Sequence, residues 1–183
     1  MGLKYTPKFD NKKAPDFHLP GVDGEMWTFA EAMGAKGLVV MFICNHCPYV
    51  KSIREQLVID AHDLINMGVN VVAIMSNDFV NYPDDSFDEM KKVAKEFNFP
   101  FPYLLDESQQ IAKDYGAVCT PDIFGINQQG TIQYRGRLNA AGIDTPHAGL
   151  RRDLVEAMIE MVETGEINSE QFPSMGCSIK WKS

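Results

Sequence analysis

The sequence predicts an α/β fold in which helices flank both faces of one central mixed β-sheet. Strand-like and helix-like segments alternate in the first half, and a hairpin and a final helix follow in the second. The length of 183 residues and the hydrophobic share of 45% suit one large core. Proline and glycine are spread along the chain rather than pooled into a linker. Residues 1–183 are therefore expected to form a single domain.

The first half of the sheet is predicted from a strand, a helix and a second strand. Residues 36–43 form a short apolar run bounded by glycine, which is typical of a strand covered on both faces. Apolar residues recur at helical spacing from residue 51 until Gly68 ends the pattern. Residues 69–75 form another strand of the buried type. A right-handed crossover between the two strands makes them parallel.

Two later helices are predicted from capping signals. Residues 86–89 have the spacing of a capping box, and an apolar helical pattern follows them. Residues 106–109 repeat this signal before another short helix. Each helix is therefore expected to begin with a side chain that accepts a backbone N–H.

The end of the chain is predicted to form a hairpin, a helix and an irregular tail. Residues 122–126 and 131–135 are two short runs on either side of a turn, which indicates an antiparallel hairpin. An apolar stripe over residues 150–162 predicts the last helix. Residues 166–183 show no clear period and are expected to form a C-terminal tail.

Composition and charge argue against several classes of partner. The net charge of -8 and the pI near 4.9 oppose binding to nucleic acid or to anionic lipid, because both need clustered lysine and arginine. The N-terminus lacks the apolar run of a secretory signal, and no membrane span is visible. The four cysteines then indicate a reducing compartment, so the cytoplasm is the expected location.

The segment Cys44-Asn45-His46-Cys47 is the strongest functional signal, a C-x-x-C unit where a buried strand meets a helix. At this spacing the two sulfurs can bond without distorting the turn. The helix N-terminus favours a thiolate and lowers a cysteine pKa from about 8.5 to roughly 3.5–7.5. Cys44 is expected to be the nucleophile at the exposed tip of the turn. Cys47 is expected in the first helical turn as the shielded partner.

Residues around this pair are predicted to support its chemistry. A partly charged imidazole at His46 would stabilise the thiolate further and favour the reduced form. Thr120-Pro121 stands between a predicted helix and the hairpin, and a proline there is often cis. A cis bond would turn the backbone of Thr120 outward beside the cysteines, where a substrate peptide could pair with that edge.

Other interpretations of the cysteines stay open. The pair could be two small buried hydrophobic residues, or it could hold zinc or copper. Zinc usually takes a second C-x-x-C or paired histidines, whereas Cys119 and Cys177 are isolated, so no metal is assigned. Each of these two residues could be a core residue or an auxiliary thiol that relays electrons. Asp84-Asp85 is interpreted as solvated surface charge.

Four segments together resemble the thioredoxin-like superfamily, and within it the redoxin branch related to alkyl hydroperoxide reductase and thiol-specific antioxidant proteins. They are residues 14–20 (A-P-D-F-H-L-P), 44–50 (C-N-H-C-P-Y-V), 115–124 (Y-G-A-V-C-T-P-D-I-F) and 176–181 (G-C-S-I-K-W). The last three resemble a bacterial subset of that branch. The resemblance implies a thioredoxin fold with an N-terminal β extension, Cys44 and Cys47 as the redox pair, and Pro121 as the cis-proline.

Three positions refine this resemblance. Thioredoxins carry a buried Asp six residues before the first cysteine, and Leu38 stands there in this chain, so no proton acceptor for Cys47 is named. In peroxiredoxins a T-x-x-C-P segment carries the peroxidatic cysteine, so Cys47-Pro48 occupies that place and Cys44 replaces the threonine. His46 resembles the histidine of strongly oxidising members, which predicts a potential less reducing than that of thioredoxin.

The leading prediction is an enzyme that catalyses thiol–disulfide exchange through Cys44 and Cys47, with a mixed disulfide as intermediate. The first alternative is a peroxidase in which Cys47 forms a sulfenic acid that Cys44 resolves. The second alternative is a non-catalytic protein that senses redox state or binds copper. The expected partners are protein or small-molecule thiols and disulfides, and no cofactor is predicted. The oligomeric state and the direction of electron flow stay open.

Overall fold

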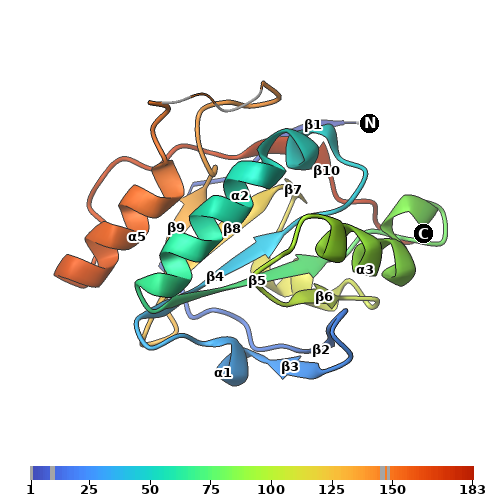
Figure 1. The fold of residues 1–183 in the computed structure, drawn as a ribbon, viewed down its shortest axis with the longest axis horizontal. Helices are drawn as coiled ribbons and strands as arrows, with labels where there is room; N and C mark the ends of the chain where they lie inside the picture. The colour runs from blue at the N-terminus through green and yellow to red at the C-terminus, as the bar shows by residue number, and fades with distance from the viewer. Residues whose placement is uncertain (1, 9–10, 145–146, 148) are drawn as a thin grey trace.

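The centre of the molecule is a five-stranded mixed sheet with the strand order β6-β5-β4-β8-β9 (Figure 1). This computed structural model describes residues 2–8, 11–144, 147 and 149–183. The strands are β4 (Gly37–Phe42), β5 (Val69–Met75), β6 (Tyr103–Leu105), β8 (Asp122–Asn127) and β9 (Ile132–Gly136). Strands β4, β5 and β6 run parallel, whereas β8 is antiparallel to β4 and β9. The predicted mixed sheet, with its parallel crossover and its hairpin, is confirmed.

Helices cover both faces of this sheet. They are α1 (Phe29–Ala32), α2 (Pro48–Asn66), α3 (Phe87–Glu96), α4 (Gln110–Tyr115) and α5 (Asp153–Thr164). Val39 and Met41 of β4 belong to the apolar core shared with α2, α3 and α5. Leu38 and Val40 belong to the core shared with α1 and α4. Successive residues of a strand point to opposite faces, so β4, which is buried throughout, serves both cores.

Two small sheets flank the central one. The hairpin of β2 (His18–Pro20) and β3 (Met26–Thr28) forms the N-terminal β extension, and Leu19 contributes to the second core. A three-stranded sheet has the order β1-β10-β7, with β1 (Leu3–Tyr5), β10 (Met175–Ser178) and β7 (Cys119–Thr120). In Figure 1 the first and last strands of the chain lie side by side at the N-terminal end of α2. The aperiodic tail therefore contains a strand.

Local details differ from the prediction at the helix starts. Helix α2 begins at Pro48 rather than at residue 51, because a proline suits the first helical position, where its missing N–H costs nothing. The prediction of a capping box is wrong for both α3 and α4. Ser86 precedes α3 without capping it through its side chain, and α4 follows Gln109 without a side-chain cap. The Asp106 carboxylate instead accepts a hydrogen bond from an N–H deeper in α4.

Within the described part of the chain, none of the helices combines the length and the apolar character needed to cross a membrane. The longest, α2, has 19 residues but carries several charged side chains.

Gly176 allows β10 to lie against the backbone of Thr120. A Cβ atom at Gly176 would stand 2.1 Å from the Thr120 carbonyl oxygen, too close for the two strands to keep their places. We predict that Gly176→Ala lowers the free energy of unfolding by about 1–3 kcal/mol, measured by urea denaturation. Gly2→Ala is the control, because nothing lies within 4 Å of a Cβ atom at that position. Equal stability of the two variants would contradict the pairing of β10 with β7.

Candidate active site

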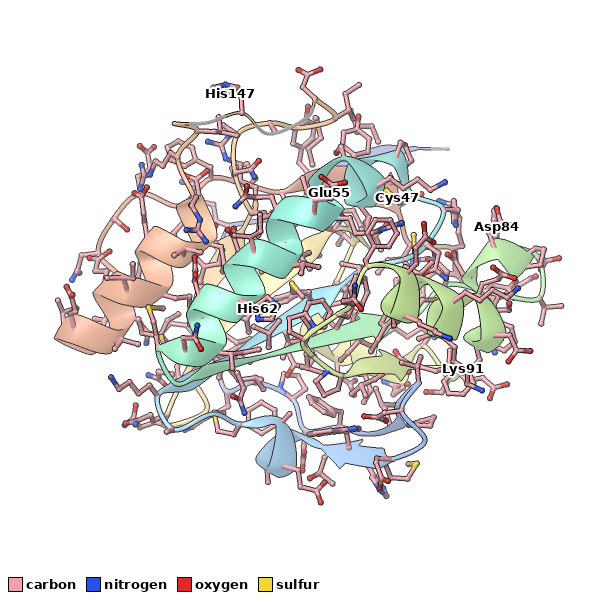
Figure 2. All side chains as sticks on the ribbon, viewed as in Figure 1. Cys47, Glu55, His62, Asp84, Lys91 and His147 are labelled. Atoms are coloured by element: carbon pink, nitrogen blue, oxygen red, sulfur yellow. The ribbon has the colours of Figure 1, made fainter. Side chains whose placement is uncertain are left out.

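The Cys44–Cys47 segment joins the end of β4 to the N-terminus of α2. Cys47 is the N-cap residue of α2, and Pro48 is its first helical residue. Figure 2 shows Cys47 at this end of the helix. The first N–H groups of a helix have no partner within it, so the cap position presents the sulfur to partial positive charge. Cys47 therefore occupies a position that stabilises a thiolate.

Both sulfurs contact one residue, Thr120. The Thr120–Pro121 peptide bond is cis. The Cys44 Sγ lies 3.3 Å from the Thr120 hydroxyl oxygen, and the Cys47 thiol donates to the Thr120 carbonyl oxygen at 3.1 Å. Thr120 lies 76 residues after Cys44 and 73 residues after Cys47 in the sequence, and the fold brings the three residues together.

Asn45 fixes the turn between the two cysteines. Its backbone N–H donates to Asp85 at 2.8 Å, and its side-chain amide donates to the Asp84 carbonyl at 3.0 Å. Its own carbonyl oxygens accept hydrogen bonds from Tyr103 and Arg54. The loop that carries Asp84 and Asp85 is thereby held over the cysteines.

This covering loop overturns one expectation. Cys44 was expected at an exposed tip, but its relative exposure is 2%, and that of Cys47 is 0%. Cys47 was expected in the first helical turn, but it is the N-cap residue and so lies just before that turn. The physical reason is that the loop at Asp85 and the strand β10 pack over the turn, and neither follows from the motif.

The pKa of Cys47 is the lowered one of the pair. The interaction with the Cys44 thiol lowers the pKa of the Cys47 thiol to about 5, against the opposing effect of burial, and smaller effects of Thr120, Cys177 and Val50 act in the same direction. The contact with the Thr120 carbonyl favours the neutral thiol, and the interaction with Cys44 outweighs it. Cys47 is thus the stronger candidate for the thiolate.

Cys44 shows the opposite behaviour. Its hydrogen bond with Cys47, its burial and the negative charge of Asp85 raise the pKa of Cys44 well above the usual value. The directions of the two pKa shifts favour Cys47 as the thiolate, whereas the sequence predicts Cys44 as the nucleophile.

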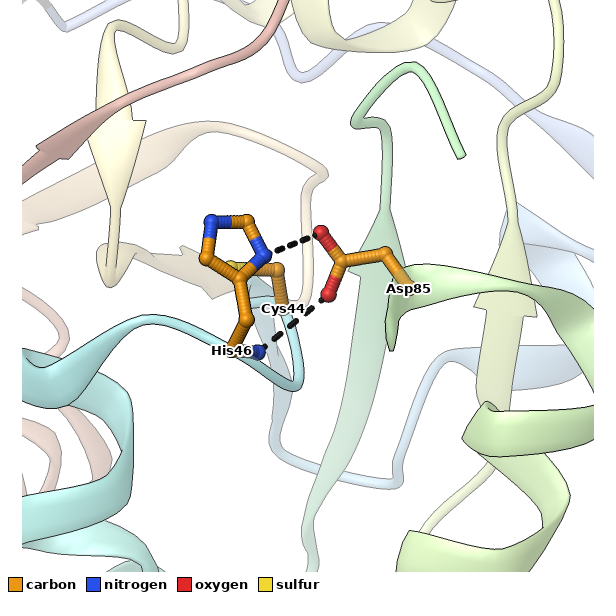
Figure 3. A group of neighbouring side chains, drawn as sticks. All are labelled: Cys44, His46 and Asp85. Atoms are coloured by element: carbon orange, nitrogen blue, oxygen red, sulfur yellow. Dashed lines mark hydrogen bonds and ion pairs between the residues drawn. The ribbon is translucent and has the colours of Figure 1, made fainter. Parts of the chain in front are cut away.

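Asp85 organises the polar side of the site (Figure 3). Its carboxylate accepts hydrogen bonds from Nδ1 of His46 at 2.7 Å and from the Asn77 side chain at 2.8 Å, besides the Asn45 N–H. The His46 ring also stacks on Tyr82 with ring centroids 5.6 Å apart. Burial would raise the pKa of Asp85, but the hydrogen bonds from His46 and Asn77 lower it overall. Asp85 in turn raises the pKa of His46.

Asp85 is the site residue that sequence reasoning missed. Asp84 and Asp85 were interpreted together as solvated charge, yet only Asp84 is exposed, and Asp85 is fully buried. Figure 2 shows Asp84 at the outside of the loop. Two adjacent carboxylates give no signal in the sequence that separates them, because only the fold of the loop decides which one points inward.

Three side chains at the site have ligand atoms that could hold a metal ion. The ligand atoms of Cys44, His46 and Asp85 lie within 4.8 Å of one another. Both oxygens of Asp85 already accept hydrogen bonds from His46 and from neighbouring N–H groups. A bound ion would have to displace the contact between His46 and Asp85.

The two remaining cysteines differ in position. Cys177 in β10 pairs with Thr120, and burial and a hydrogen bond with Cys47 raise the pKa of Cys177 to about 11. Cys119 is buried with its thiol against the Pro121 carbonyl oxygen, and burial raises its pKa. The edge of Thr120 that was expected to receive a substrate peptide is therefore occupied by β10.

The fold and the site together define a class of protein. A mixed sheet with flanking helices, a cysteine pair at a strand–helix junction and a cis-proline segment beside it are the features of a thioredoxin-fold protein with a thiol site. Residues 11–135 match the model of the AhpC/TSA family, and the chain belongs to this family. Membership of this redoxin family supports an oxidoreductase activity.

Individual proteins are also similar to this chain. The chain is 25% identical over 126 residues to the thioredoxin-like protein YneN of Bacillus subtilis, a match that covers 68% of this chain and 69% of that protein. An uncharacterized conserved protein from Geobacillus kaustophilus is similar in structure, with a TM-score of 0.91, 41% identity and coverage of 100% and 97%. A hypothetical protein from Sinorhizobium meliloti has a TM-score of 0.89, 36% identity and 98% coverage of both chains.

The low pKa of Cys47 depends on its hydrogen bond with Cys44. In the reduced protein, thiolate absorbance should titrate near pH 5, because the pKa values of the other three cysteines are raised. We predict that Cys44→Ala moves this midpoint toward the ordinary cysteine value of about 8.5. Cys119→Ala is the control and should leave the midpoint in place. A midpoint that stays near 5 in Cys44→Ala would show that Cys44 does not stabilise the thiolate.

The contact between His46 and Asp85 should stabilise the fold in a defined pH window. The lowered pKa of Asp85 stabilises the protein above about pH 4, and the raised pKa of His46 does so fully below about pH 6.5. Asp85→Asn should cost about 2–4 kcal/mol within this window and less on either side of it. Urea denaturation across this pH range measures the effect.

Asp84→Asn is the matched control, since this neighbouring carboxylate is exposed and should change stability by less than about 0.5 kcal/mol. If Asp85→Asn and Asp84→Asn gave the same stability at every pH, Asp85 would not hold the site together.

Proposed function

We propose that this protein is a thiol–disulfide oxidoreductase that cycles Cys44 and Cys47 between a dithiol and a disulfide. One observation carries the proposal: both sulfurs contact Thr120, and their pKa values shift in opposite directions. A thiolate beside a thiol supplies both the attacking group and the resolving group of disulfide exchange.

The exchange proceeds in two balanced steps. The Cys47 thiolate attacks one sulfur of a partner disulfide, and the other partner sulfur leaves as a thiolate. Cys44 then loses its proton, attacks the Cys47 Sγ, and releases the second partner sulfur as the Cys44–Cys47 disulfide forms. The partner gains two electrons, which the cysteine pair loses. The reverse sequence oxidises a partner dithiol.

The site helps the second step by removing a charge. The negative charge on Cys47 contributes to the raised pKa of Cys44. Once Cys47 is bonded to a partner, that charge is gone, and Cys44 loses its proton more readily. The attack order is the reverse of the order that the motif predicts, while the chemistry is the same.

The partners proposed are thiols and disulfides, and the cytoplasm is the proposed location. The net charge of -8 argues against nucleic acid as a partner. Because both sulfurs are buried, a small disulfide such as that of glutathione suits the site better than a rigid protein loop.

A peroxidase is the second candidate, and the buried Cys47 thiolate favours it. Cys47 is followed by Pro48, as the peroxidatic cysteine of peroxiredoxins is, and its pKa is lowered to about 5. The thiolate would attack a peroxide oxygen, form a sulfenic acid and release an alcohol or water. Cys44 would then attack that sulfur and release water as the disulfide forms.

Oxidation of the reduced protein by glutathione disulfide and by hydrogen peroxide separates the two candidates. We predict that glutathione disulfide converts the wild type to a form with a Cys44–Cys47 disulfide, identified by peptide mass mapping. Hydrogen peroxide at equal concentration should react at least about tenfold more slowly. The proposed site is suited to thiol–disulfide exchange, in which the leaving group is a thiolate, and peroxide has no such leaving group. Cys119→Ser is the control and should behave like the wild type.

The opposite ranking, with peroxide faster than glutathione disulfide, would favour the peroxidase. Oxidation that never links Cys44 to Cys47 would refute both candidates.

A further inference from the structure

The strand β10 occupies the edge of Thr120 on which a substrate strand would pair. Cys177 lies opposite Thr120, and Ser178 lies opposite Cys119, in an antiparallel register. Gly176 lets the strand approach this closely, because any side chain there would collide with the Thr120 carbonyl. The chain therefore places a cysteine of its own opposite Thr120, on the edge where a partner strand would pair.

The register decides which way the Cys177 side chain points. Residues directly opposite each other in an antiparallel pair share one face, and neighbours along a strand alternate. The side chain of Thr120 contacts the Cys44 sulfur, so Cys177 shares the face of the active site. Cys119 is next to Thr120 in β7 and faces the other side, with its sulfur at the Pro121 carbonyl.

The contacts of Cys177 with Cys47 agree with this register. The Cys47 and Cys177 thiols are close enough to affect each other, since Cys47 contributes to the raised pKa of Cys177. Cys47 thus interacts with two thiols, that of Cys44 and that of Cys177. All three residues are buried, and Cys177 is the least completely buried of them.

The position of Cys177 is fixed at both ends of β10. Before the strand, Ser174 donates to the Pro121 carbonyl at 2.6 Å and to the Thr6 hydroxyl through its N–H at 2.9 Å. After the strand, the N–H of Lys180 donates to Asn77 at 2.9 Å. Cys177 is thus held in place against the active site.

We infer that Cys177 is a third redox cysteine, which forms a disulfide with Cys47 and passes the oxidising equivalent of the Cys44–Cys47 disulfide outward to a partner dithiol. The inference rests on the proposed function, because it needs the Cys44–Cys47 disulfide as its oxidant. In this scheme Cys177 is the first thiol that reacts with the Cys44–Cys47 disulfide, and it does so within the same chain.

The transfer through Cys177 takes three exchange steps. The Cys177 thiolate attacks the Cys47 Sγ of the Cys44–Cys47 disulfide, and Cys44 leaves as a thiolate and takes up a proton. A partner thiolate then attacks the Cys177 Sγ, and Cys47 leaves. The low pKa of Cys47 makes it a good leaving group. The partner's second thiol attacks the mixed disulfide, so the partner ends as a disulfide and Cys177 as a thiol.

Cys44→Ser isolates the contact between Cys47 and Cys177. Treated with glutathione disulfide, this variant should form a Cys47–Cys177 disulfide through a transient glutathione adduct on Cys47, as shown by intact mass and peptide mapping. Cys44→Ser/Cys119→Ser should give the same product. Cys44→Ser/Cys177→Ser should hold its glutathione adduct at least about tenfold longer, because no second thiol faces Cys47.

A stable adduct in Cys44→Ser, or a Cys47–Cys119 disulfide, would overturn the inference. If the wild type formed the Cys44–Cys47 disulfide while Cys44→Ser formed none, only the role of Cys177 would fail. If the wild type formed no disulfide between Cys44 and Cys47, the proposed function itself would fail.

The outward transfer is tested with reduced ribonuclease as the protein dithiol. Oxidised Cys177→Ser should oxidise it at least about tenfold more slowly than the wild type or Cys119→Ser. Equal rates for Cys177→Ser and the wild type would overturn the transfer through Cys177.

Discussion

The contact of both active-site sulfurs with Thr120 is the constraint on which the rest of the site depends. Strand β4 leads to Cys44, the N-terminus of α2 carries Cys47, and β7 carries Thr120. These elements come from distant parts of the chain, and they must pack together before one sulfur can stabilise the charge of the other. The acidity of Cys47 is therefore a property of tertiary packing, and the C-x-x-C spacing supplies only its starting point.

A single polar network ties the tail of the chain to the charged side of the site. The Asn77 amide donates to Asp85, and its carbonyl oxygen accepts the N–H of Lys180 just after β10. The carboxylate that faces His46 and the strand that carries Cys177 are thus positioned by the same residue. The geometry of three cysteines and the charge of Asp85 are consequently linked.

The sequence was sufficient for features that depend on local patterns. Residues 69–75 were predicted as a strand and form β5 with those bounds, because apolar runs reflect burial of the segment itself. The cysteine pair was placed at a strand–helix junction for the same reason. The burial of Cys44 and the role of Asp85 could not be predicted, because a loop and a C-terminal strand far along the chain cover the turn. The strand β10 lacks the length that gives a visible period.

The most direct test of this account is to identify which cysteine reacts first in the reduced wild type. A small alkylating agent applied at about pH 6, followed by peptide mapping, compares the four thiols at a pH where few ordinary cysteines are ionised. We predict modification of Cys47 ahead of Cys44, Cys119 and Cys177. Modification of Cys44 first would contradict it, since the charge would then lie on the sulfur that the fold holds protonated.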